Sequence, residues 1–213
     1  MDIENAYITL PKGFVANGVH AGLKPNGNPD LGFIASDRPA SVAGVYTRNL
    51  VKGHSLTRSI SIINKKETVR GIIINSGNAN ACVGEIGEED ASSMASAVAK
   101  ELNVDADDIL TASTGVIGSR LPLDKIIAAI PGLVNNASSS EETGHRAERA
   151  IMTTDTQPKE VAATVSIFGK EITIAAIAKG SGMIHPNLAT MISVFTTDAN
   201  IKQDVSVHDQ RQR

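Results

Sequence analysis

Aromatic residues, cysteine and excess positive charge are all scarce in this chain of 213 residues. Tryptophan is absent and aromatic residues make up 3%, which disfavours the stacking surfaces of proteins that bind single-stranded nucleic acid. The formal net charge is -3, so the basic surface typical of a nucleic-acid-binding domain is missing too. The single cysteine, Cys82, excludes an internal disulfide and favours a reducing compartment such as the cytoplasm.

Several sequence signals are missing as well. No apolar run reaches the ~18 residues that a membrane span needs, and the acidic start of the chain does not resemble a signal peptide. The five histidines show no metal-ligand spacing, and neither a phosphate-binding loop nor a dinucleotide fingerprint is present. We therefore expect no metal, no cofactor, no nucleic-acid partner and no membrane.

The pattern of hydrophobic residues predicts alternating helices and strands. Apolar residues at helical spacing predict helices over 88–102, 122–130 and 140–152. Runs rich in β-branched residues predict strands over 43–48, 71–75 and 107–113, and a hairpin over 161–168 and 171–178 that turns at Gly169-Lys170. Residues 54–64 fit either state. The fold class is thus α/β or α+β, a layered sheet-and-helix domain whose strand order the sequence does not give.

A loop after the last predicted strand holds the most distinctive residues. It begins at Lys179-Gly180, passes through a His-Pro turn at His185, and reaches Ala189-Thr190. We interpret Ala189-Thr190 as a self-cleavage point, because a threonine freed there becomes a nucleophile that carries its own amino-group base. Lys179 either stabilises negative charge or is a solvated surface lysine.

Three further segments have both a functional and a structural interpretation. Residues 114–118 lie between a strand and a helix, so their backbone N–H groups could face an oxyanion, or the glycines could simply form a turn. Residues 75–84 could contact a ligand or form an ordinary polar loop, in which Cys82 is expected to be a buried, inert thiol. In 152–159, three threonines and Asp155 could bind a polar substrate or satisfy the end of a helix.

Together these segments resemble one family, the ornithine acetyltransferases, also called glutamate N-acetyltransferases. The resemblance covers most of residues 43–199 and is carried, in the family's order, by Asn75 to Cys82, Ser113 to Gly118 with Leu121-Pro122, Met152 to Thr156 with Pro158-Lys159, and Lys179 to Met191 with Phe195 and Thr197 to Ala199.

The resemblance implies a fold and a mechanism. The fold is the self-processing one similar to N-terminal-nucleophile enzymes. Thr190 would attack the carbonyl of Ala189, cleave the chain, and then carry the acetyl group from N-acetylornithine to glutamate as an acetyl-threonine intermediate. Thr114 and Gly115 match the family's oxyanion hole, and Thr153 and Lys179 match substrate-binding positions. Acetyl-CoA is an additional donor in some members.

The same resemblance implies a division of the chain. Residues 1–189 correspond to the family's α chain and 190–213 to the start of a β chain that continues much further in family members. We therefore expect this chain to be the front part of a longer protein, incomplete at its C-terminus and without transferase activity alone. The family's assembly implies an α2β2 heterotetramer with its own β chain.

Two other functions remain open at this stage. An N-terminal-nucleophile amidohydrolase or aminopeptidase would pass its acyl group to water instead of glutamate. A non-catalytic chain that only folds with a partner would fit the early C-terminus.

Overall fold

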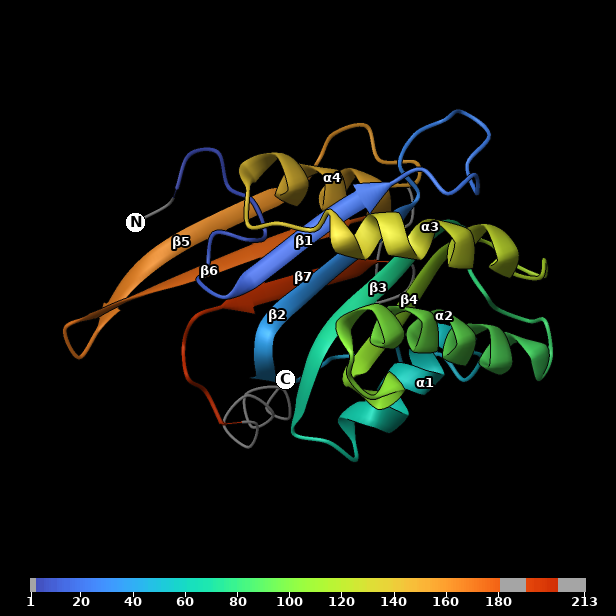
Figure 1. Cartoon of the computed structure of the whole chain (residues 1–213), viewed down its shortest axis with the longest axis horizontal. Helices are drawn as coiled ribbons and strands as arrows, with labels where there is room; N and C mark the ends of the chain where they lie inside the picture. The colour runs from blue at the N-terminus through green and yellow to red at the C-terminus, as the bar shows by residue number, and fades with distance from the viewer. Residues whose placement is uncertain (1–2, 181–190, 203–213) are drawn as a thin grey trace.

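Two β-sheets and the helices packed on them form the described part of the chain, residues 3–180 and 191–202 of the computed structural model (Figure 1). The first sheet has the order β1-β2-β3-β4, and the second has the order β5-β6-β7. The strands are β1 Phe14–Val19, β2 Leu31–Ser41, β3 Thr68–Asn78, β4 Ile109–Val116, β5 Glu160–Ile167, β6 Lys170–Lys179 and β7 Ile192–Thr197. The helices are α1 His54–Ile63, α2 Ile86–Leu102, α3 Leu123–Asn135 and α4 Glu141–Ile151, with a 3-10 turn at Ala106–Asp108.

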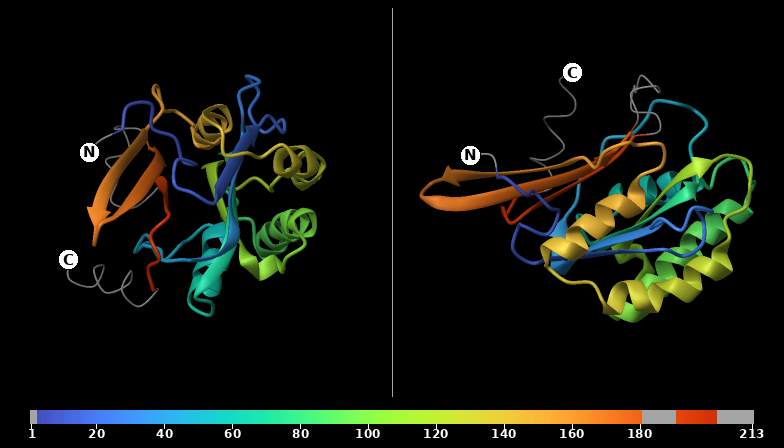
Figure 2. Two further views of the ribbon diagram at one scale, coloured as in Figure 1. Left: turned by 60° about the vertical axis from the view of Figure 1, so that its left-hand side comes forward. Right: turned by 90° about the horizontal axis from the view of Figure 1, so that it is seen from above.

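The first sheet is buried on both faces. Neighbouring residues of a strand point to opposite faces, yet Phe33 and Ile34 are both buried, as are Ile73 and Ile74. One face packs against Met94 and other residues of α2 and α3, and the opposite face packs against α4 and β6. Figure 2 shows this sheet as the middle layer, between helices on one side and the second sheet on the other. This result confirms the predicted layered α/β class.

Helix α1 covers the free edge of β4. The Ser59 hydroxyl donates to the Thr111 carbonyl at 2.7 Å and accepts from the Thr111 N–H at 2.8 Å, while Arg58 donates to the Ile109 carbonyl at 2.6 Å. Side chains of α1 thus form the hydrogen bonds to the β4 backbone that a neighbouring strand would otherwise form. They protect this edge of the sheet from pairing with another chain. Strands β3 and β4 run parallel, so the chain must return to the starting end of the sheet between them. Helix α2 forms this crossover connection.

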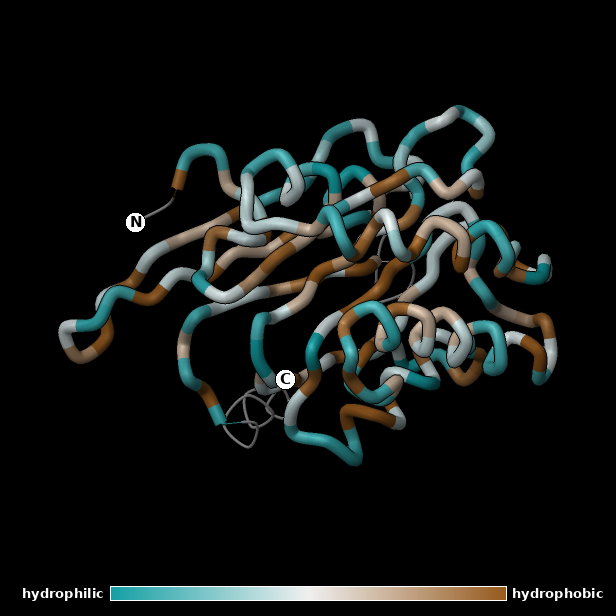
Figure 3. The backbone as a smooth tube through the Cα atoms, viewed as in Figure 1, coloured by the Kyte–Doolittle hydropathy of each residue, from teal (hydrophilic) through white to brown (hydrophobic). Residues whose placement is uncertain are grey.

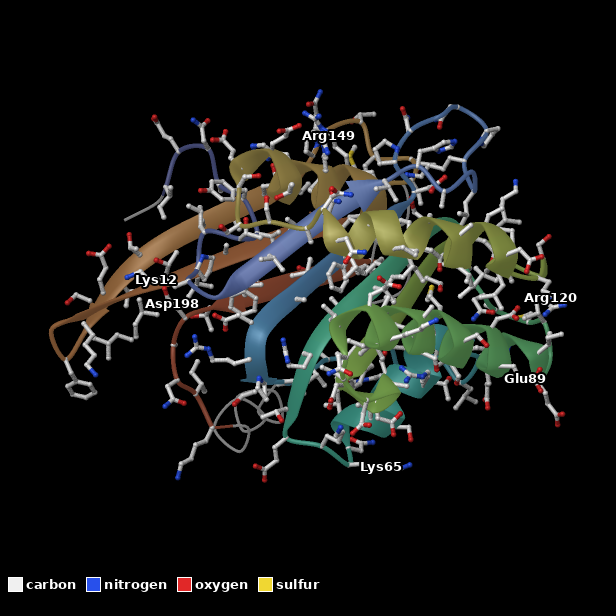
Figure 4. All side chains as sticks on the ribbon, viewed as in Figure 1. Lys12, Lys65, Glu89, Arg120, Arg149 and Asp198 are labelled. Atoms are coloured by element: carbon white, nitrogen blue, oxygen red, sulfur yellow. The ribbon has the colours of Figure 1, made fainter. Side chains whose placement is uncertain are left out.

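The second sheet is buried on one face only. Ile177, Ala175 and Thr196 face inward and are buried, whereas Val161 and Phe195 on the outer face are 66% and 70% exposed. Figure 3 shows hydrophobic stretches along β5 and β6 as far as the hairpin tip. Asp198, just after β7, accepts from the Lys12 N–H at 3.3 Å and from the Thr173 N–H at 2.8 Å, so it ties the N-terminal segment to this sheet (Figure 4).

Most predicted elements are confirmed, with four corrections. Residues 43–48 form no strand, and residues 107–108 belong to the 3-10 turn instead of β4. Helix α3 continues through Pro131 to Asn135, because burial of Leu133 and Val134 outweighs the one backbone hydrogen bond that a proline removes. The hairpin turns at Phe168-Gly169, both with positive φ, instead of Gly169-Lys170. The ambiguous segment 54–64 is helix α1.

Candidate active site

Lys179 and Thr114, predicted as site residues from segments 65 positions apart, are in direct contact. The Lys179 ammonium at the end of β6 donates to the Thr114 hydroxyl of β4 at 3.3 Å. Both side chains are buried, at 2% and 4% exposure, so the interpretation of Lys179 as a solvated surface lysine is wrong. Burial lowers the pKa of Lys179, whereas the negative charge of Asp155 acts to raise it. The contact joins the two sheets.

Gly115 of β4 lies directly against the backbone of β3. It pairs with Gly77 of β3, and it has a φ of 139°. A Cβ atom at Gly115 would lie 2.3 Å from the carbonyl carbon of Gly77 and 2.5 Å from the backbone nitrogen of Asn78. Packing therefore requires glycine here, whether or not its backbone also serves an oxyanion. The positive φ of the structural interpretation is confirmed, but Gly115 lies within β4 instead of in a turn, and a role of its backbone at an oxyanion stays a prediction.

Thr153 is half-buried just after α4, and its backbone is held by Asp155. The Asp155 carboxylate accepts from the Thr153 N–H at 3.1 Å, the Gly180 N–H at 2.7 Å and the Lys159 ammonium at 2.6 Å. Burial alone would raise the pKa of Asp155, but these hydrogen bonds, led by that of Lys159, lower it to about 2. Asp155 thus satisfies backbone beyond the helix end, as the structural interpretation expected, and it also connects Thr153 to Gly180.

Lys24 is a charged residue near Lys179 and Asp155 that the sequence did not reveal, and its ammonium donates to the Pro29 carbonyl at 2.7 Å. It lies on a loop fixed by the buried carboxylate of Asp30, which accepts from the N–H groups of residues 21–24 at 2.6 to 3.2 Å. This loop packs over Gly77, because the Leu23 carbonyl lies 3.3 Å from the ideal Cβ position there. Burial lowers the pKa of Lys24, with Asp30 and Asp155 opposing and the nearby Lys179 contributing. The turn-forming residues of 24–29 mark a loop in the sequence but do not show that its lysine faces inward.

Glu148 of α4 is a second residue that the sequence did not reveal. Its side chain is fully buried, and its Oε1 accepts from the Lys159 N–H at 3.0 Å, while Oε2 has no hydrogen-bond partner. Burial raises the pKa of Glu148. A glutamate within an amphipathic helix gives no indication that it faces inward.

The polar segment 75–84 is a loop only after Asn78, because β3 continues through Asn75 to Asn78. Asn75 donates to the Asn78 carbonyl at 2.8 Å and accepts from the Ser113 hydroxyl at 2.6 Å, and Asn80 donates to the Gly87 carbonyl at 2.8 Å. These bonds support a structural role for its amide side chains. Cys82 has a positive φ and is exposed, so the prediction of a buried thiol is wrong.

The predicted cleavage point, Ala189-Thr190, and His185 lie outside the described residues. Both ends of the segment that contains them are described and lie together. Lys179 of β6 pairs with Ile192 of β7, and the ideal Cβ position of Gly180 is 3.3 Å from the Met191 Cγ. The described residues on either side of this segment therefore meet next to the buried Lys179–Thr114 contact.

Within residues 3–180 and 191–202, no group of three or more His, Cys, Asp or Glu side chains is arranged to hold a metal ion. Over the same residues, no helix is both long and apolar enough to cross a membrane.

The layered sheets define a class of fold seen in enzymes with N-terminal nucleophiles. An L-aminopeptidase D-Ala-esterase/amidase from Ochrobactrum anthropi, described as a variant of the Ntn hydrolase fold, superimposes with a TM-score of 0.54 at 15% identity, over 96% of this chain and 66% of that one. At this identity the likeness concerns the fold alone.

The ArgJ family model matches residues 15–211, and the chain belongs to the ArgJ family. It is 48% identical over 202 residues to the arginine biosynthesis bifunctional protein ArgJ of Oceanobacillus iheyensis, covering 95% of this chain and 48% of that protein. A chloroplastic ArgJ of Zea mays is 45% identical over 93% of this chain and 43% of its own length. The chain thus spans about half the length of the curated relatives that it matches.

Two solved ArgJ-type structures share the fold closely. A crystal structure of ArgJ from Bacillus halodurans superimposes with a TM-score of 0.84 at 38% identity, over 90% of this chain and 97% of that one. Ornithine acetyltransferase from Mycobacterium tuberculosis, crystallised with ornithine, superimposes with a TM-score of 0.82 at 37% identity, over 89% of this chain and 99% of that one. These matches confirm the family predicted from the sequence.

Proposed function

We propose that this chain, as part of the whole protein, transfers an acetyl group from N-acetylornithine to glutamate with Thr190 as nucleophile. The observation that carries the proposal is the buried Lys179–Thr114 contact at the point where the segment containing Ala189-Thr190 joins β6 and β7. The ornithine bound in the related Mycobacterium tuberculosis enzyme supports a substrate of this chemistry. Glutamate as acceptor rests on the family resemblance.

Self-cleavage would come first. The Thr190 hydroxyl attacks the Ala189 carbonyl, the peptide nitrogen leaves as the new α-amino group, and water opens the resulting ester. The unperturbed pKa of an α-amino group, about 7.7–8.0, suits a general base at neutral pH. The lengths of the relatives support cleavage, since this chain covers 97% and 99% of two crystallised chains but about half of the curated relatives.

Acetyl transfer would then use the same hydroxyl twice. Thr190 attacks the acetyl carbonyl, and ornithine departs with the proton that the α-amino group accepted. The amine of glutamate then attacks the acetyl ester, which releases N-acetylglutamate, and the proton lost by that amine returns to the Thr190 oxygen. Thr114 and the Gly115 backbone would stabilise the oxyanion, and Lys179 and Thr153 would bind substrate. Lys179 and Thr114 are buried, so their electrostatic interactions with a bound substrate would be stronger than the same interactions at a solvent-exposed surface.

The partners and compartment are proposals on the same basis. We infer that the β chain of the same protein completes the site in an α2β2 assembly, that no cofactor is required, and that acetyl-CoA is an additional donor to be tested. The cytoplasm remains the proposed compartment for a chain with a single, exposed cysteine.

The first prediction concerns the nucleophile. In the full-length protein, Thr190→Ala should abolish both cleavage and transfer, since both need the hydroxyl, whereas Thr190→Ser should retain part of each. Intact mass spectrometry measures cleavage, and formation of N-acetylglutamate measures transfer. Cleavage after Ala189 in the alanine variant would contradict the mechanism.

A hydrolase is the alternative proposal, because the same threonine nucleophile could pass its acyl group to water. A hydrolase would release the acyl group to water at a rate independent of glutamate. Assaying N-acetylornithine turnover with and without glutamate separates the two, and turnover that never yields N-acetylglutamate would favour the hydrolase.

A further inference from the structure

Asp155 joins three parts of the chain at the candidate site. Its fully buried carboxylate accepts the N–H of Thr153 after α4, the N–H of Gly180 after β6, and the ammonium of Lys159 before β5. Oδ1 receives the Gly180 and Lys159 bonds, and Oδ2 receives the Thr153 bond. Oδ2 thus holds the local backbone before β5, and Oδ1 connects that segment to Gly180, which is 25 positions away in the sequence.

The positions held in this way are the ones that matter for the proposed reaction. Thr153 is a proposed substrate-binding residue. Gly180 follows Lys179 directly and is the last described residue before the segment that contains Ala189-Thr190. A clamp on the Gly180 N–H fixes the backbone from which the Lys179 side chain reaches Thr114. A displacement of a substrate-binding side chain by about 1 Å is enough to reduce the rate of the catalysed reaction strongly.

Charge gives Asp155 a second task. The charged or titratable groups that surround Lys179 from the described elements include Lys159 before β5 and Lys24 on the β1–β2 loop, both cationic, and Asp155. Burial and the charge of Lys159 act against the protonated form of Lys179, and Asp155 favours it. An ammonium that is to bind a carboxylate or an oxyanion must stay protonated at working pH.

We propose that Asp155 is a positioning residue, which holds Thr153 and Gly180 in register and thereby places the Lys179 side chain beside Thr114. This inference rests on the proposed transferase function. Asp155 touches no reacting atom in this role. It acts through its backbone partners and through the field at Lys179.

A simple ion pair with Lys159 is the competing explanation. The Lys159 side chain is 45% exposed, and pairs open to solvent contribute little by themselves. If Asp155 acted only through the ion pair, removing either partner would lower kcat/KM by the same factor. If it acts through its backbone hydrogen bonds and its charge near Lys179, Lys159→Met should lower kcat/KM slightly and Asp155→Asn strongly.

The experiment compares Asp155→Asn, Lys159→Met and wild type in the full-length protein. Asp107→Asn is the matched control, because it makes the same change at an exposed carboxylate paired with Arg58. We expect Asp155→Asn to lower kcat/KM for N-acetylornithine about 10- to 100-fold, the size expected for losing a charge-assisted hydrogen bond. The alkaline limb of its kcat/KM profile should move to lower pH, because the remaining cations and burial then lower the pKa of Lys179 further.

The outcomes separate the explanations. Amide exchange at Thr153 and Gly180 should accelerate in Asp155→Asn without global unfolding, whereas Lys159→Met and Asp107→Asn should retain wild-type exchange. The alkaline limb should stay in place in Asp107→Asn and move to higher pH in Lys159→Met, because loss of that cation favours protonated Lys179. Equal losses in Asp155→Asn and Lys159→Met, or an unshifted limb in Asp155→Asn, would overturn the positioning role. A wild-type protein without transfer activity would instead refute the proposed function itself, and this inference with it.

Discussion

Single side chains at the site are buried polar groups whose partners come from distant segments. Lys179 and Thr114 come from different sheets, and Asp155 binds backbone on both sides of β5 and β6. Burying such groups is costly unless they are hydrogen-bonded, and these bonds meet that requirement. The cost is one reason to assign the cluster a function beyond stability, since apolar side chains would fill the same space more favourably.

The hydroxyl of Thr114 can be removed without changing the shape of its side chain. Thr114→Val keeps the shape of the side chain but removes the hydroxyl that Lys179 contacts, so we expect transfer to slow by about 10²-fold, the usual cost of one oxyanion donor. The effect should be smaller than that of Thr190→Ala, because the Gly115 backbone donor remains. Thr114→Ser is the control and should stay near wild type in steady-state assays. Equal rates for wild type and Thr114→Val would remove Thr114 from the oxyanion role.

Among the elements, the adjacent ends of β3 and β4 determine where the site can form. Gly77 and Gly115 face each other across the parallel pair, and the loop carrying Lys24 packs on the Gly77 side. The backbone of Gly77 and Asn78 leaves no room for a side chain at position 115. Thr114, the neighbour of Gly115 in β4, contacts Lys179 at the end of β6.

Gly115→Ala tests this close approach. The new methyl group would overlap the Gly77 backbone at 2.3 Å and would also strain a φ of 139°. Gly118→Ala is the matched control, since φ is also positive there but no atom lies within 4 Å of its ideal Cβ. Backbone strain alone costs about 1–3 kcal/mol. We expect Gly115→Ala to lower the free energy of unfolding in urea by at least about 2 kcal/mol more than Gly118→Ala. Equal losses would mean that strand separation is not limited by this contact.

The elements themselves were largely predictable, and their contacts were not. Helix α2 repeats Met94 and Val98 on one face, and Ser140 caps α4 by accepting the Thr143 N–H, both readable from local pattern. Residues 43–48 misled because a β-branched run forms a strand only when a neighbour is available to pair with. Lys24 and Glu148 were missed because nothing local marks a loop lysine or a helical glutamate as part of a site.

The candidate site is formed by residues of both sheets, which differ in how far their faces are buried. The first sheet is covered on both faces, while the second exposes Val161 and Phe195 on its outer face. The site lies where the two sheets meet, so its stability depends on their packing and on the charges at that junction. Asp155 is the best place to measure this dependence, because its pKa of about 2 lies well below the ordinary value of 3.8.

This lowered pKa predicts a pH dependence of global stability. A carboxyl whose pKa is lower in the folded state stabilises the protein above its unfolded pKa, and that contribution is lost as the pH falls toward the folded value. The full contribution is about 2 kcal/mol, and about half of it should be lost by pH 3. The difference in unfolding free energy between wild type and Asp155→Asn in urea should therefore narrow by about 1 kcal/mol between pH 6 and pH 3. A difference that stays constant over this range would contradict the lowered pKa.

The sequence by itself determined the mixed α/β class, most helices and strands, and the family, because these depend on local periodicity and on motifs in a fixed order. Only the tertiary structure decided that Lys179 is buried against Thr114, that Asp155 holds Thr153 and Gly180, and that Lys24 stands beside them. The physical reason is that a hydrogen bond between residues 65 positions apart depends on how two sheets pack, and no local pattern encodes that packing.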